Sequence, residues 1–310
     1  MTSSIVATRV IRRVVAVICV LLVATACQAD KLPAYSPTAS LPEVPFRTAE
    51  EHDEVMQDCT WPYVLELTGS PGALLYYGSR HTSNPDDPQI EDMRKRWEAF
   101  RPTVAVTENR GGFHLGGLAR TVKSLGEFGV AIHAAKSADL PIWTLEPTWD
   151  DEVAEVTAVY SPAEATLFYT LRVFLAERGD DRSPSEVDKL ARHLLKKRGS
   201  RPGLAGSLPT LDAMDALWRS SFDDPRDWRE LPPPAIWPGK EPTHLQAISR
   251  HVNQVRDRHA ARILIELVRR GERVFAVAGG SHVVKQEPVL FAALAEGPVH
   301  PGRTVRCGLD

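Results

Sequence analysis

Short apolar runs alternate with longer amphipathic segments along most of this chain. Runs rich in β-branched and aromatic residues predict strands, and they lie at 61–67, 73–78, 103–108, 141–146 and 274–282. Apolar residues at helical spacing predict helices at 86–99, 114–125, 128–138, 150–159, 162–178, 184–197, 244–270 and 287–296. This alternation indicates an α/β fold, with a mainly parallel central sheet flanked by helices.

Two features modify the simple alternation. Thr-Gly-Ser-Pro-Gly separates the first two apolar runs, so a hairpin is expected between 61–67 and 73–78. Residues 199–242 are rich in Pro and Gly and predict a loop-rich insertion or lid, which carries Trp218, Trp228 and Trp237. We therefore expect one α/β domain over residues 51–310, with a long helical and loop-rich insertion.

Ionisable residues follow four of the predicted strands, where each apolar run ends. They are His81, Glu108, Glu146 and His282. Because ligands bind outside the carboxyl ends of parallel strands, we expect these side chains to line one cleft. Both histidines stand in the pattern Gly-x-x-His, which His114 also fits without following an apolar run. The alternative interpretation is that each histidine merely caps the end of a strand.

Two histidines and nearby carboxylates support two kinds of hydrolytic chemistry. His81, His282 and Glu146 are candidate ligands of a divalent metal such as Mn, Co or Zn, with an open position left for water. Without a metal, a glutamate and a histidine would activate water directly. Glu108 is the leading candidate for the general base in either case.

A cation beside these carboxylates would complete such a site. Arg256 is the candidate, to hold a substrate carboxylate or to stabilise an oxyanion. The alternative for Arg256 is a structural salt bridge to Glu266 or Asp257.

Some polar residues are weaker candidates. Arg80 directly precedes the first site histidine, and His251 and His259 lie eight residues apart on the long predicted helix. Either of these two histidines would reach the cleft if the helix faces it, and a surface or core role is the alternative. His133 lies within an apolar helix and is interpreted as a hydrogen-bonded core residue.

The overall charge narrows the class of partner. The formal net charge is −3 at pH 7, which argues against a nucleic-acid-binding surface. Nucleic acid is therefore not an expected partner.

The N-terminus has the pattern of an export signal. Arg9, Arg12 and Arg13 precede the apolar run 14–26, which is too short for a comfortable membrane span. The stretch from Val23 to Cys27 resembles the bacterial lipobox, although Ala24 stands where Leu is preferred. The resemblance implies that Cys27 carries an acyl chain such as palmitate, which anchors the chain outside the cytoplasm on a bacterial membrane. A plain signal peptide and an uncleaved anchor are the alternatives.

Residues 27–50 follow the signal and contain four prolines among small and polar residues, which predicts a flexible tether.

Two cysteines remain for the folded domain. Cys19 lies in the signal, which leaves Cys59 and Cys307 at opposite ends of the domain. An exported compartment permits disulfides and domain termini often lie close together, so we predict a bridge between them. Two buried thiols are the alternative.

The motifs occur in an order that resembles the TraB/PrgY and GumN group, which is related to the Tiki proteases. The resemblance covers about residues 60–297, with degenerate motifs. They read Gly-Ser-Arg-His81, then Arg-Pro-Thr-Val-Ala-Val-Thr-Glu108, Leu-Pro-Ile-Trp-Thr-Leu-Glu146, Val255-Arg256-Asp257-Arg258 and Phe275-Ala-Val-Ala-Gly279-Gly-Ser-His282. Two positions and one stretch depart from the family: Arg80 replaces a small residue, Asp257 replaces Asn, and Val-Val-Lys-Gln-Glu follows His282.

The resemblance implies a hydrolytic site. In the Tiki members the two Gly-x-x-His histidines and the glutamate belong to a metal-dependent peptidase, and the more distant erythromycin esterases use a similar set without an obligatory metal. We therefore expect a membrane-tethered, metal-dependent hydrolase whose substrate is a peptide or another small molecule. A metal-independent, esterase-like hydrolase and a non-catalytic lipoprotein that binds a peptide or an envelope component are the alternatives.

Overall fold

The computed structural model describes residues 31–68, 71–113, 116–179, 181–222, 225–237, 242–295 and 302–309. The signal segment 1–26, the expected lipid attachment site Cys27, and His114 lie outside these ranges. Among the helices described, none combines the length and the apolar character needed to cross a bilayer.

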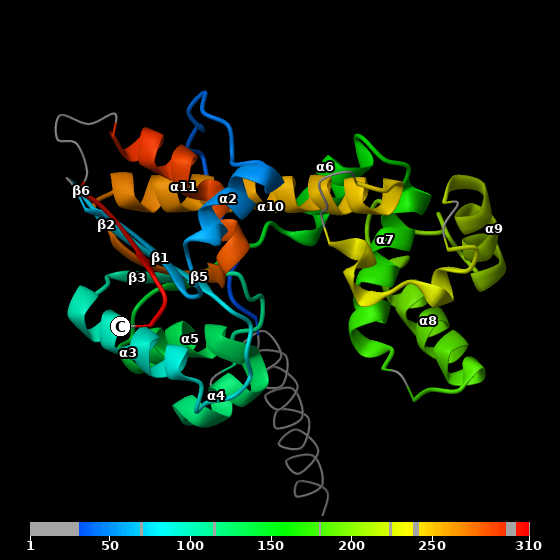
Figure 1. Ribbon diagram of the computed structural model, residues 1–310, viewed down its shortest axis with the longest axis horizontal. Coiled ribbons are helices and arrows are strands. Elements are labelled where there is room, and N and C mark those ends of the chain that lie inside the picture. Colours follow the sequence, from blue (N-terminus) through cyan, green and yellow to red (C-terminus); the bar gives the residue numbers. More distant parts are fainter. Residues whose placement is uncertain are drawn as a thin grey trace, which may run out of the picture.

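A six-stranded sheet forms the centre of one lobe (Figure 1). The strand order is β4-β3-β5-β2-β1-β6, and β4, β3, β5 and β2 run parallel. These four parallel strands confirm the predicted mainly parallel sheet. β1 is antiparallel to both of its neighbours, and its pairing with β2 confirms the predicted hairpin. The strands are β1 (Tyr63–Thr68), β2 (Ala73–Ser79), β3 (Val104–Thr107), β4 (Ile142–Thr144), β5 (Arg273–Gly279) and β6 (Gly302–Cys307).

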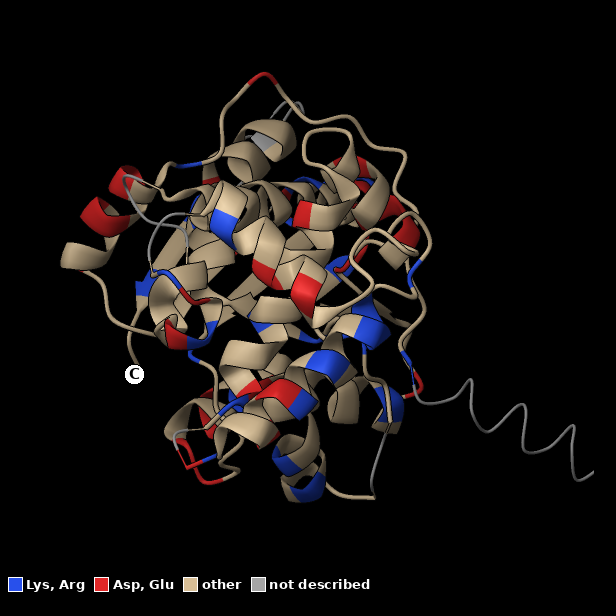
Figure 2. Ribbon diagram, turned by 90° about the vertical axis from the view of Figure 1, so that its right-hand side faces the viewer, with Lys and Arg blue, Asp and Glu red and all other residues tan. Residues whose placement is uncertain are grey.

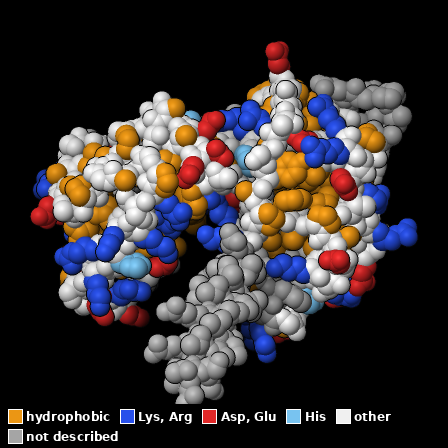
Figure 3. All heavy atoms as spheres, turned by 180° about the vertical axis from the view of Figure 1, so that it is seen from behind, with side chains coloured by type: hydrophobic (Ala, Val, Ile, Leu, Met, Phe, Trp, Pro, Cys, Tyr) orange, Lys and Arg blue, Asp and Glu red, His pale blue; other side chains and the backbone are white. Residues whose placement is uncertain are grey.

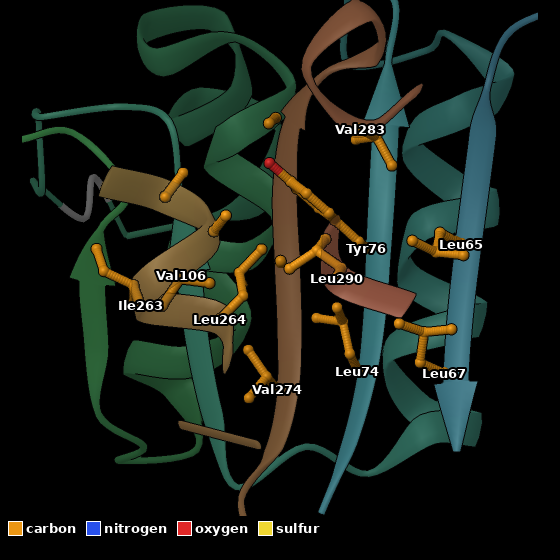
Figure 4. Close-up of a cluster of buried hydrophobic side chains, with 14 of the residues drawn as sticks. Leu65, Leu67, Leu74, Tyr76, Val106, Ile263, Leu264, Val274, Val283 and Leu290 are labelled. Carbon is orange, nitrogen blue, oxygen red and sulfur yellow. The ribbon is translucent and has the colours of Figure 1, made fainter. Parts of the chain in front are cut away.

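Helices cover both faces of the sheet. On one face lie α3 (Pro88–Phe100), α4 (Leu118–Leu125) and α5 (Gly129–Ser137). On the other face, α10 (His244–Arg269) and α11 (Gly280–Ala295) pack on apolar side chains of β1, β2, β3 and β5 (Figure 4). The helix predicted at 287–296 begins earlier, at Gly280. His282 consequently lies in the first turn of this helix rather than on the preceding strand.

A second lobe is built from helices alone. It contains α6 (Trp149–Thr157), α7 (Pro162–Glu177), α8 (Pro184–Arg198) and α9 (Leu211–Ser221), with its own apolar core. Figure 2 views the molecule from this side and shows acidic and basic residues interspersed along the helices.

The predicted loop-rich insertion, residues 199–242, is more ordered than its composition suggests. It contains α9, whose Leu211, Met214 and Trp218 are buried at helical spacing, and two short 3₁₀ helices, Trp228–Glu230 and Pro233–Ile236. Trp218 and Trp228 belong to the core of the helical lobe, whereas Trp237 is exposed.

The 26-residue helix α10 connects the two lobes. Its first half contributes Leu245, Ile248 and Val252 to the core of the helical lobe. Its second half contributes residues from Ala260 to Val268 to the core beneath the sheet. Consequently Arg256 and Asp257, between these halves, stand where the two lobes meet.

The segment 27–50, expected to be a flexible tether, instead lies against the domain over its described part. The N–H of Leu32 donates to the Arg110 carbonyl at 2.9 Å, and the Tyr35 hydroxyl donates to Glu266 at 3.0 Å. A proline-rich segment forms few hydrogen bonds with itself, and here its polar groups are satisfied by the domain. It leads into α2 (Ala49–Gln57), which Thr48 and Glu51 begin with a capping box.

The predicted bridge between Cys59 and Cys307 is confirmed, with the Cα atoms 5.2 Å apart. It joins the segment before β1 to the end of β6, where Cys307 is opposite Tyr63 in the ladder. The strand β6 was not predicted from the sequence.

Candidate functional site

Three of the predicted site residues meet at the carboxyl edge of the sheet. Glu108 directly follows β3, His81 follows β2 by two residues, and His282 lies in the first turn of the helix after β5. Their side chains line one cleft of about 540 Å³, between the sheet lobe and the helical lobe. Asn253 and Arg256 of α10 line the same cleft.

Glu108 is the central anion of this cleft. Its Oε1 lies 2.7 Å from Arg256 Nη2 and 3.6 Å from His282 Nε2, and its Oε2 accepts a hydrogen bond from the Gly279 N–H at 2.8 Å. Burial raises the pKa of this carboxyl group, but the charges of His282 and Arg256 outweigh burial and hold the pKa of Glu108 well below its usual value. The carboxyl group of Glu108 is therefore ionised at neutral pH.

His81 is oriented by a buried carboxylate, Glu127. The Nδ1 atom of His81 lies 2.8 Å from Glu127 Oε1, and that oxygen also accepts a hydrogen bond from the Ser79 hydroxyl at 3.0 Å. Glu127 Oε2 accepts the N–H of Thr82 at 3.0 Å. The hydrogen bond to Glu127 raises the pKa of His81. Glu127 thus fixes both the ring orientation and the tautomer.

His282 has an equivalent partner in Asp257. Its Nδ1 atom lies 2.6 Å from Asp257 Oδ1, which also accepts a hydrogen bond from Gln286 Nε2 at 2.7 Å. Burial lowers the pKa of His282, but the charges of Asp257 and Glu108 outweigh burial, so the pKa is raised. In both histidine–carboxylate pairs Nδ1 is engaged, which leaves Nε2 for a water or a substrate atom in the cleft.

The two glycines at the junction of β5 and α11 lie close to side chains of neighbouring elements. A Cβ on Gly279 would lie 3.2 Å from His81 Nε2 and 3.4 Å from Glu108 Oε2. A Cβ on Gly280 would stand 1.9 Å from the ring of Trp61. Gly280 therefore requires glycine so that the start of α11 can pack on the Trp61 ring, whereas a Cβ at Gly279 would make a tight contact with His81.

Glu146, predicted to ligate a metal, is occupied by two arginines. Arg256 Nε lies 2.9 Å from each of its carboxylate oxygens, and Arg110 Nη2 lies 3.2 Å from Oε2. This arrangement aims the guanidinium of Arg256 at Glu108, so we assign Glu146 a positioning role. The anticipated alternatives for Arg256 are both wrong, because neither Glu266 nor Asp257 pairs with it.

Two weaker candidates lie away from the cleft. The side chain of Arg80 is largely exposed and points toward Asp87, at 3.5 Å. His251 packs against the Tyr160 ring in the helical lobe, and its Nε2 lies 3.4 Å from the carbonyl of Glu155.

Three residues of the site were not recognised from the sequence. Glu127 stands in the short 3₁₀ helix Gly126–Phe128 between α4 and α5, and Arg172 lies in the middle of α7. Asp257 was considered as a departure from a family pattern and as an ion-pair partner of Arg256, but not as a partner of His282. Nothing in their local sequence marks them, because each reaches the cleft from an element distant along the chain.

The residues present fit a metal only in part. Two imidazole Nε2 atoms and a carboxylate are suitable donors. However, Glu108 already binds Arg256 and the Gly279 amide, and the guanidinium places a positive charge at 2.7 Å from the carboxylate. Within the described ranges, no three His, Cys, Asp or Glu side chains are grouped so as to hold a metal ion.

No family model, curated protein or solved structure matches this chain.

Proposed function

We propose that this chain is a hydrolase of peptide or ester bonds that works outside the cytoplasm, tethered to a bacterial membrane through Cys27. One observation carries the proposal: Glu108 lies between Arg256 and the Nε2 atom of His282, in a cleft that His81 also lines. The export signal and the order of motifs in the sequence support the location and the reaction class.

The pKa shifts divide the roles between the residues. A carboxylate whose pKa is held far below neutrality is a weak base, whereas the raised pKa of His282 makes its imidazole a stronger base than Glu108. Glu108, expected from the sequence to be the general base, is therefore better suited to position water and to balance the charge of an imidazolium. His282, held by Asp257, is the stronger candidate for the base.

The proposed reaction uses both histidines. His282 Nε2 takes a proton from a water whose oxygen forms a bond to the carbonyl carbon of the substrate. The resulting oxyanion is stabilised by the guanidinium of Arg256, whose Nη1 makes only a long contact, 3.4 Å, to Asn253. His81 donates a proton to the leaving nitrogen or oxygen as its bond to carbon breaks, and a later proton exchange with solvent restores both histidines.

The placement of Arg256 favours the metal-independent form of this chemistry over the metal-dependent form. Were a metal bound, His81, His282 and Glu108 would hold it, and it would supply a more acidic water. The cation at Arg256 opposes a second positive charge at that carboxylate. We therefore expect activity to persist after chelation of divalent metals.

The test is a peptide and ester library incubated with the full-length protein in detergent. Samples contain EDTA, or added manganese, cobalt or zinc, and Glu108→Gln is assayed in parallel. Cleavage by the wild type, but not by the variant, supports the hydrolase. Tight binding without cleavage under every condition would establish the alternative, a peptide-binding lipoprotein, and activity only with metal would overturn the metal-independent form.

A further inference from the structure

A second cavity, of about 330 Å³, adjoins the cleft. The two share Glu108, Arg172 and Arg256, so a molecule held at Glu108 has access to both. The second cavity extends between the sheet lobe and the helices α6, α7 and α8. Its charged lining consists of four arginines and three glutamates, Arg110, Arg172, Arg198, Arg256, Glu108, Glu146 and Glu152.

Two of the four arginines already have counter-ions. Arg256 pairs with Glu108 and Glu146, and Arg110 pairs with Glu146 and with Glu152 at 2.8 Å. All three glutamates of the cavity are therefore engaged by these two arginines. The remaining two arginines form no ion pair with a described residue, and the cavity lining carries one more arginine than glutamate. The glutamates act on Arg172 only from beyond ion-pair distance.

The two arginines of the cavity without an ion pair are Arg172 of α7 and Arg198 at the end of α8. Neither forms a hydrogen bond or an ion pair with another described residue, and Nε of Arg198 is buried without a partner. Burial, together with the neighbouring Arg256, lowers the pKa of Arg172. Burial, together with the neighbouring Arg201, lowers the pKa of Arg198. Partly buried cations without a paired counter-ion destabilise a fold, so a bound anion would stabilise this arrangement.

The ring of Trp149 holds part of this cluster in place. The guanidinium groups of Arg110, Arg198 and Arg201 lie 4.5, 5.3 and 4.6 Å from its centroid. Phe128 and Tyr169 add aromatic surface to the cavity. A ligand with an apolar part beside its charge would thus be accommodated. Figure 3 shows Lys and Arg side chains gathered between the two lobes on the face seen from behind.

We propose that this cavity binds an oxyanion of the substrate, a carboxylate or a phosphate, through Arg172 and Arg198. This inference rests on the proposed function, because it places the bond to be cleaved at Glu108 and the charged group beyond Arg256. Guanidinium groups match the planar, two-oxygen face of a carboxylate or phosphate. The substrate class would be short peptides with a free C-terminal carboxylate, or carboxylic esters that also carry a phosphate group, with the charged end close to the scissile bond.

Calorimetry on the full-length protein in detergent tests the inference without requiring turnover. The probes are N-acetyl-leucine, its uncharged amide and inorganic phosphate. Arg172→Gln should weaken binding of the charged probes about ten- to hundredfold, while Arg172→Lys should retain part of the affinity. Arg192→Gln is the matched control, because Arg192 lies on α8 but is exposed and paired with Asp188 at 3.5 Å. Circular dichroism would confirm that each variant is folded.

Each outcome decides a point. Tighter binding of N-acetyl-leucine than of its amide, lost in Arg172→Gln but not in Arg192→Gln, supports a carboxylate site, and the same behaviour with phosphate supports a phosphate site. Equal binding of charged and neutral probes, or charged-probe binding that Arg172→Gln leaves unchanged, overturns the inference. Cleavage that ignores a C-terminal charge would refute this inference and leave the hydrolase standing. Charge-selective binding without any cleavage would support the anion site and refute the hydrolase.

Discussion

The Nδ1 atom of His282 lies 2.6 Å from Oδ1 of Asp257, although the two residues are 25 positions apart on different helices. Asp257 is buried and receives a second hydrogen bond from Gln286, so its orientation is fixed before it contacts the histidine. The pair therefore directs Nε2 of His282 toward Glu108, 3.6 Å away. The proton-transfer role that we propose for His282 depends on this contact.

Asp257→Asn tests that dependence. The asparagine keeps the size of the side chain but removes a charge that raises the pKa of His282. We expect the pKa of His282 to fall and the hydrolytic rate to drop about 10- to 100-fold. NMR titration of the histidine ring measures the first effect and steady-state kinetics the second. Asp212→Asn, at an exposed site on α9, is the control, and an unchanged titration of His282 in Asp257→Asn would contradict the assignment.

Removing charge at Glu108 should abolish turnover. Glu108→Gln keeps the hydrogen bond from the Gly279 N–H but leaves Arg256 with one fewer anion and no longer balances an imidazolium at His282. Loss of such a group typically costs 10²–10⁴ in rate. Single-turnover assays would separate this loss from weaker binding. A variant with more than about a tenth of wild-type activity would refute a central role for Glu108.

The two histidines should act as a unit. His81→Ala and His282→Ala should each lower the rate severely, and the double variant should be little slower than the worse single variant, because residues of one centre are not additive. Rate constants for the three variants, compared with His251→Ala as a control remote from the cleft, check this expectation. Independent, multiplicative losses would instead indicate that the histidines belong to separate sites.

Stability should depend on the protonation of His282. Burial lowers its pKa and the charges of Asp257 and Glu108 raise it more, so the folded-state pKa lies above the unfolded value of about 6.5. Protonation therefore stabilises the fold, fully below the unfolded pKa, and this contribution is lost as pH rises through the folded pKa. The slope for this proton is at most about 1.4 kcal/mol per pH unit. Urea denaturation across this window should show a steeper decline for wild type than for His282→Gln, and parallel curves would contradict the prediction.

The disulfide should contribute substantially to stability. The bridge closes a segment with a sequence separation of 248 residues and ties the edge strand β6 to the start of β1. Cys59→Ser, Cys307→Ser and the double variant should each lose about 2–5 kcal/mol of unfolding free energy. Denaturation with and without reductant measures this. The variants should be insensitive to reductant, and labelling of Cys59 and Cys307 as free thiols in the unfolded, unreduced protein would refute the bridge.

Local patterns in the sequence determined most of the secondary structure. Alternating apolar runs and helical spacing predicted β1 to β5 and most helices, because burying one face of each element imposes its own periodicity. The pattern had no signal for β6, whose residues are mostly exposed, so its position reflects pairing with β1 and the bridge from Cys307 to Cys59. Similarly, the proline-rich composition of residues 27–50 predicted a tether, because its contacts with Glu266 and the Arg110 carbonyl involve distant residues.

The candidate site, too, was predictable from the sequence only in part. The sequence determined that His81, Glu108 and His282 would follow strands, and parallel strands bring such positions to one edge. Only the tertiary structure decided what each side chain contacts: Glu127 holds His81 from 46 positions away, and Glu146 binds arginine. Arg172 enters from another lobe through the fold of α7 against α10. Such pairings form between elements far apart in the chain, so no local periodicity records them, and their energies arise only once packing has excluded water.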